Sequence, residues 1–154
     1  MYTTLLTLHS WLRWAVLVAA LIAVFRAVNG VIGKRPWTPT DDRAGIWFVN
    51  LIDLQMLLGL IMYFFLSPIT TAALRDFGAA MQSSGLRFWS VEHVFGMIVA
   101  IAIAHAGRAR TKKVRPDAAP HKVAAISFVL ALLAILLSIP WPGTPNGRPL
   151  WRGF

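Results

Sequence analysis

Two histidines, each near the start of a long apolar segment, are the residues of this sequence best suited to chemistry. His9 lies in the first apolar segment and His93 in the third. An imidazole in hydrocarbon finds no hydrogen-bond partner, so each ring needs a protein group, water or a cofactor. Axial ligation of a b-type haem requires two such rings at equal depth, because the iron takes one nitrogen from each side. We therefore predict a haem ligated by His9 and His93.

Arg13 follows His9 by one helical turn and is costly at that depth unless it reaches the headgroups or is paired. One interpretation is an interfacial anchor. The other is an ion pair, either with Glu92 or with a carboxylate of the cofactor. Under the haem hypothesis, Arg13 binds a propionate.

Small residues share the face of the third segment that carries His93. Gly96, Ala100 and Ala104 follow at helical spacing and leave a groove. Such a groove takes either a neighbouring helix or a flat macrocycle, and the first is commoner in membrane bundles. The haem hypothesis places Gly96 and Ala100 in the cofactor cleft. The alternative is that His9 lies among headgroups while His93 bonds Glu92 or a backbone carbonyl.

Asp53 is the most conspicuous polar residue of the second apolar segment. A carboxylate about 10 Å from the start of a membrane helix is rare and is a functional candidate by default. It could serve as a proton or quinone group. A protonated Asp53 bonded to a neighbouring helix would satisfy the same physics, since polar residues also hold membrane helices together.

Two further histidines, His105 and His121, lie toward the other end of the third and fourth segments. His105 is ~18 Å deeper than His93 and ~120° around the helix, so it belongs to a different site or to none. His105 and His121 have matched depths and are the weaker candidates for a second haem. Because both lie among Arg and Lys, solvated interface histidines are the alternative. Copper ranks below haem, since the methionines form no tight cluster with histidine.

The composition indicates that these residues belong to a membrane protein. With 154 residues, 57% hydrophobic and 14% charged, the chain is too apolar for a soluble domain. Four runs are long enough to cross ~30 Å of hydrocarbon, at about 4–28, 46–66, 91–107 and 123–139. We expect a single all-α domain over 1–154, an integral membrane four-helix bundle. Asn29-Gly30 is expected to end the first helix, Thr40, Asp41 or Asp42 to cap the second, and Ser90 to cap the third.

The net charge of +9 is distributed as the positive-inside rule predicts, so nucleic acid is not an expected partner. Ten of the 15 basic residues lie in the first and third loops, which places those loops in the cytoplasm and both termini on the periplasmic side. Because the chain has no cysteine, disulfides, iron–sulfur clusters and covalent c-type haem are excluded.

Three short motifs carry a resemblance: LLTLHSWLRW at the start, SVEHVFGM in the third segment and IPWP near the end. In these the chain resembles a small bacterial family of four-span membrane proteins with a cytochrome b-like label. The resemblance implies a multi-pass protein of the bacterial inner membrane that transfers electrons between a quinone pool and a redox partner. Larger cytochromes b carry paired histidines on two helices, whereas the first helix here has only His9, which favours one haem over two.

Two rival functions remain open at the level of sequence. The chain could be a cofactor-free structural or assembly subunit of a larger membrane complex, with its histidines and Asp53 as interhelical hydrogen-bond partners. It could also form a homo-oligomer. A small transporter of metal or protons is the weakest alternative, because the four spans show neither mid-membrane helix breaks nor an internal repeat. Whether the chain is a quinone-linked enzyme subunit stays open.

Overall fold

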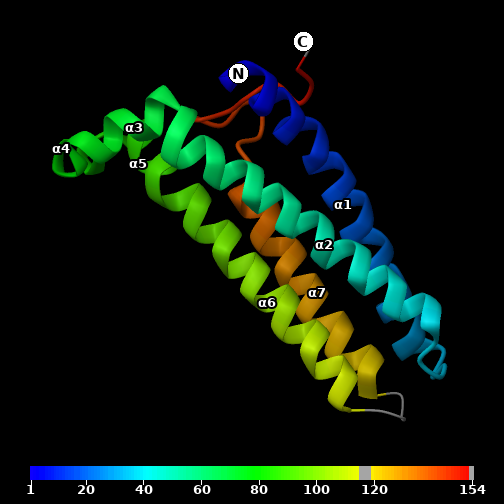
Figure 1. Ribbon diagram of the computed structural model, residues 1–154. Helices are drawn as coiled ribbons and strands as arrows, with labels where there is room; N and C mark the ends of the chain where they lie inside the picture. Colours follow the sequence, from blue (N-terminus) through cyan, green and yellow to red (C-terminus); the bar gives the residue numbers. More distant parts are fainter. Residues whose placement is uncertain (115–118, 153–154) are drawn as a thin grey trace.

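Four long helices form one bundle in the computed structural model, which describes residues 1–114 and 119–152 (Figure 1). They are α1 (Tyr2–Ile32), α2 (Pro39–Ile61), α6 (His93–Lys113) and α7 (Ala119–Ser138). The described residues contain no strand, and all four helices are long and apolar enough to cross a membrane. The all-α class and the four membrane-length helices are therefore as predicted. Both termini lie at one end of the bundle, here called the terminal end, and the opposite end is the loop end (Figure 1).

The helices extend beyond the predicted apolar runs. Asn29-Gly30 does not end α1, which continues to Ile32. Gly30 is needed inside the helix because a Cβ there would collide with the His121 ring. Hydrophobicity alone marks the part of a helix that lies in hydrocarbon and misses flanking turns held by such tertiary contacts.

The cap of α2 differs from the expected residues. Thr38 is the N-cap, and Asp41 completes a capping box in which each side chain binds the other's backbone N–H. Pro39 occupies the first helical position, where its missing N–H costs nothing. Thr40 and Asp42 were therefore wrong as caps, and Asp41 acts from inside the first turn.

Two π-helical turns flank the terminal end of the bundle. Segment η1 (Met62–Leu66) continues α2, and η2 (Phe88–Glu92) leads into α6. Ser90 lies within η2 and donates to the Leu86 carbonyl, so it does not cap the third helix as predicted. The Tyr63 hydroxyl donates to the Ser90 carbonyl at 2.8 Å and joins the two turns. π-Turns often accompany functional sites.

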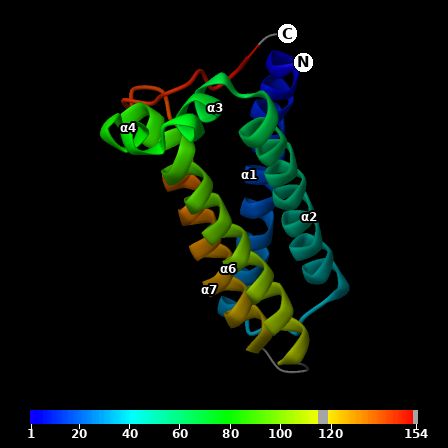
Figure 2. The ribbon, with the colours of Figure 1, turned by 60° about the vertical axis from the view of Figure 1, so that its left-hand side comes forward.

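Three short helices project from the side of the terminal end: α3 (Pro68–Arg75), α4 (Phe77–Gln82) and α5 (Ser84–Arg87) (Figures 1 and 2). Ser67 ends the second span and caps α3 by accepting from the Thr70 N–H. The connection between η1 and η2 thus consists of three short helices.

Small residues set the spacing of the bundle. Helix α1 packs against both α2 and α7, α6 packs most extensively against α7, and α2 and α6 make the sparsest contact between neighbours. Close approach of α6 to α7 is possible because Gly107 and Gly96 lie against serines of α7. Phe48 and Phe128, both fully buried, meet edge to face nearer the loop end.

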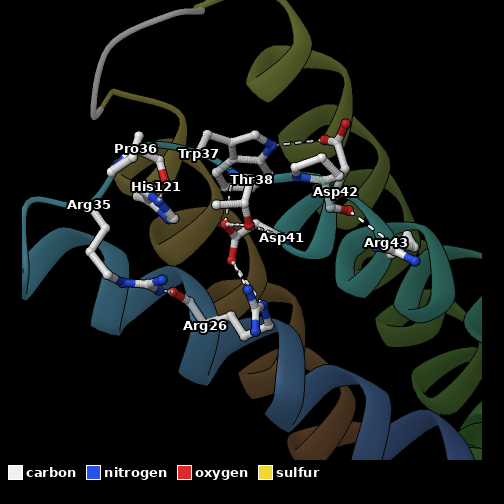
Figure 3. Close-up of polar contacts among 10 residues, drawn as sticks. Arg26, Arg35, Pro36, Trp37, Thr38, Asp41, Asp42, Arg43 and His121 are labelled. Atoms are coloured by element: carbon white, nitrogen blue, oxygen red, sulfur yellow. Dashed lines mark hydrogen bonds and ion pairs between the residues drawn. The ribbon is translucent and has the colours of Figure 1, made fainter.

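Polar contacts hold the helices together at the loop end (Figure 3). Arg26 of α1 pairs with the buried carboxylate of Asp41 at 2.8 Å, and the Trp37 indole donates to Asp42 at 2.9 Å. Arg108 of α6 reaches Asp42 at 3.3 Å. These bonds connect α1, α2 and α6 at the loop end.

Candidate functional site

A cavity of about 390 Å³ opens in the bundle toward the terminal end. Its walls come from α1, α2, both π-turns, the start of α6, the end of α7 and the C-terminal segment. The volume lies in the ordinary range of small-molecule sites. Most of its wall is apolar, and its polar groups are few and come from separate helices.

His9 and His93 both line this cavity. His9 is contributed by α1 and His93 by the first turn of α6. Arg13, one helical turn after His9 on α1, lines the same cavity. The structure thus brings together the three residues that the haem hypothesis requires at one site.

The ring of His93 is held by the end of α7. Its Nδ1 atom lies 2.8 Å from the Ser138 carbonyl oxygen. Because a carbonyl oxygen only accepts, Nδ1 carries the proton, and in the neutral ring the lone pair is then on Nε2. The backbone-carbonyl bond considered as a rival to ligation is therefore present. It is also the bond that orients a metal-ligating histidine.

His9 has a different environment. A Cβ added at Gly59 would lie 3.2 Å from His9 Cε1, so the glycine leaves room for the ring on the α2 side. Gln55 donates its amide to the His9 backbone carbonyl at 3.0 Å. No partner within the described structure reaches the buried Nδ1 of His9, the Oε1 of Gln55 or the Nε of Arg13. Since buried polar atoms are nearly always bonded, this concentration around one cavity points to a ligand.

Arg13 makes its direct contact with the C-terminal segment. Its guanidinium donates to the Leu150 carbonyl at 2.7 Å, and the Trp14 indole donates to the same oxygen at 3.2 Å. Trp151 stacks on Trp14 with ring centroids 5.0 Å apart. The C-terminal segment therefore folds back onto α1 beside the cavity. Glu92 is not the partner of Arg13.

Glu92 instead pairs with Arg87 at 2.8 Å, outside the cavity. Two other arginines, Arg148 and Arg152, line the cavity together with Arg13. Arg148 lies over the Trp89 ring at 5.1 Å. Sequence reasoning missed both residues, although a tail rich in tryptophan, arginine and proline was a signal that this segment folds back onto the bundle.

Gly96 and Ala100 do not line the cavity, contrary to their predicted place in the cleft. A Cβ at Gly96 would collide with the Ser138 hydroxyl, and Ala100 is fully buried in the core. The groove below His93 is therefore filled by α7, which is the commoner use of small residues in membrane bundles.

Asp53 and the remaining histidines also lie away from the cavity. Asp53 bonds His105 at 2.9 and 3.1 Å across α2 and α6. His121, expected at a wet boundary, is fully buried beside Gly30 and approaches the Pro36 carbonyl with Nε2 at 3.3 Å (Figure 3). His105 is exposed while His121 is enclosed, so the structure does not bring the two rings together as a second haem would need. Among the described residues, no group of three metal-binding side chains occurs.

No family model, curated protein or solved structure matches this chain. The functional argument therefore depends on the geometry of the cavity and its residues.

Proposed function

We propose that this chain binds one b-type haem between His9 and His93 and serves in electron transfer within a membrane. The observation that carries the proposal is that two histidines from separate helices line one cavity, where the Ser138 carbonyl fixes the tautomer of His93. The unpartnered polar atoms of His9, Gln55 and Arg13 support it, because a bound group would explain their burial.

Each residue of the site has a definable task. His93 presents Nε2 because its Nδ1 is committed to α7, and His9 supplies the ring from α1. Arg13, Arg148 and Arg152 would offset the charge of two propionates at the outer mouth. The apolar walls and the stacked tail would limit the access of water to the haem. Proteins use such exclusion of water to tune haem reduction potentials.

When bound, a b-type haem supplies reversible one-electron chemistry at its iron. We propose a quinone or a redox protein as the partner in that transfer, and the bacterial inner membrane as the location. The basic loops would lie in the cytoplasm and the cavity mouth toward the periplasm. Asp53 has no contact with the cavity in this geometry, so we assign it no proton or quinone role here. A second haem at His105 and His121 is not part of the proposal.

Ligand variants test the proposal. His9→Ala and His93→Ala should each abolish stable haem binding or change the reduced spectrum from that of a six-coordinate haem. His105→Ala is the matched control, since it removes a histidine of the same helix as His93 outside the cavity. Unchanged reduced spectra in both cavity variants would refute the ligand assignment.

A cofactor-free structural subunit of a larger membrane complex is the second candidate. It is favoured by one observation: the small-residue face of α6 is packed against α7 and leaves no slot for a macrocycle there. This function predicts a colourless preparation that co-purifies with a fixed set of partners. A haem-loaded chain purified alone would exclude it.

A further inference from the structure

The Asp53–His105 pair lies on the outer surface of the bundle. It bridges α2 and α6, the neighbouring helices with the sparsest mutual contact. The two side chains remain 44% and 49% exposed, respectively. The pair therefore lies outside the core of the bundle and faces the surroundings of the protein.

Asp53 also lies within the apolar part of its span. That part covers about 46–66, and Asp53 is about 10 Å from its start at 1.5 Å per residue. Lipid at that depth offers no hydrogen bonds, and a carboxylate facing it is expensive. Polar groups in membrane spans are normally covered by protein or water.

The surface around the pair holds further unused hydrogen-bonding capacity. Asn50 is exposed one turn from Asp53, and its side chain bonds none of the described residues. His105 uses Nε2 on Asp53, which leaves Nδ1 for another group. Acceptors and donors thus occur side by side on one face.

Small residues make this face accessible to another helix. Ala102 and Ala106 of α6 are exposed at a spacing of four residues, about 60° and 100° around the helix from His105. Such pairs allow close approach of helix backbones in membranes. Together with the polar groups they form the α2–α6 seam, defined by Asn50, Asp53, Ala102, His105 and Ala106.

We infer that the α2–α6 seam is covered by a second copy of this chain in a two-fold symmetric dimer. The seam is self-complementary: the carboxylate of Asp53 in one copy can accept from Asn50 or His105 of the other, and the reverse contact follows from symmetry. Bridging the two copies removes the polar groups from lipid while Ala102 and Ala106 permit the approach. This inference does not depend on haem binding.

Disulfide trapping tests the dimer directly, because the natural chain has no cysteine. Ala102→Cys and Ala106→Cys are introduced singly, and membranes are oxidised before solubilisation. The matched control is Leu137→Cys on α7, whose side chain is 84% exposed on another helix. We expect a disulfide-linked dimer, twice the mass of the 17.0 kDa chain, from at least one seam variant and none from the control.

A second arm tests the polar pair. Asp53→Leu, combined with whichever of Ala102→Cys and Ala106→Cys gives the cross-linked dimer, should lower the yield of that dimer at least several-fold. A monodisperse elution profile is the check on folding. Absence of dimer from both seam variants would overturn the inference. So would equal trapping at Leu137, or a cross-linked product with the mass of a different partner protein.

Discussion

His93 of α6 is anchored to the last residue of α7, with its Nδ1 atom 2.8 Å from the Ser138 carbonyl oxygen. A backbone carbonyl at a helix end lacks an intrahelical partner and is free to accept such a bond. The orientation of the imidazole is thus set by the packing of two helices. Disturbance of that packing should be visible at the proposed haem site.

Gly96→Ala should lower the haem content of the purified protein. The added methyl would collide with the Ser138 hydroxyl, which must turn away from the Ala134 carbonyl, and would lie 3.1 Å from the Ser138 Cβ, so that residue must also give by a few tenths of an ångström. We expect a loss of about 1–3 kcal/mol in the free energy of unfolding, as for overpacked cores. Gly78→Ala is the control, because its nearest neighbour would be 3.7 Å away. Haem content per chain and thermal unfolding in detergent measure the two effects. Equal behaviour of the two variants would show that Gly96 does not position His93.

Arg13→Gln should lower the midpoint potential of the proposed haem. A nearby positive charge favours the reduced state, which carries one positive charge fewer, and the guanidinium lies at the cavity wall. A loss of about 1 kcal/mol of charge interaction corresponds to ~40 mV for one electron. A redox titration of the haem bands measures the shift.

The exposed Arg75 of α3 supplies the control for this charge change. Arg75→Gln should leave the potential within a few millivolts of the natural protein, because the side chain does not line the cavity. Equal shifts in both variants would mean that Arg13 acts through the overall charge of the chain, and the propionate role would be wrong.

Thr38→Ala should destabilise the bundle by about 1 kcal/mol, the usual cost of a lost N-cap. Thr38 caps α2 and accepts from the Asp41 N–H, while Asp41 also holds Arg26 of α1. Thr40→Ala, at an exposed position within the same turn, should change stability by less than about 0.5 kcal/mol. Thermal unfolding of both variants distinguishes the two threonines, and a larger loss from Thr40→Ala would contradict the observed cap.

Length and apolarity were sufficient to predict four helices that are long and apolar enough to cross a membrane, because crossing hydrocarbon demands about 20 apolar residues. Helix ends were less predictable because they depend on tertiary contacts. The His121 ring against Gly30 allows α1 to continue through an Asn-Gly step. Thr38 and Thr40 are both residue types that cap helices well. The tertiary contact of Arg26 with Asp41 is what distinguishes them, because it fixes Asp41 in the first turn of α2, three residues after Thr38.

The candidate site was predictable only in part, because it too depends on tertiary contacts. Helix direction and depth alone suggested that His9 and His93 share a location, and both line one cavity. The partners of His105 and Arg13 were not predictable. The position of a residue along its own helix gives neither the tilt of that helix nor the residues of other helices that lie beside it. The Asp53–His105 bond and the return of the tail over Arg13 are contacts of that kind.

The most direct test of the proposed function is the reduced-minus-oxidised absorption spectrum of the detergent-solubilised chain, purified after expression with haem supplementation. We predict Soret and alpha bands of a six-coordinate b-type haem, at a stoichiometry near one haem per chain. A colourless protein that remains folded and acquires no such bands under these conditions would contradict the proposal.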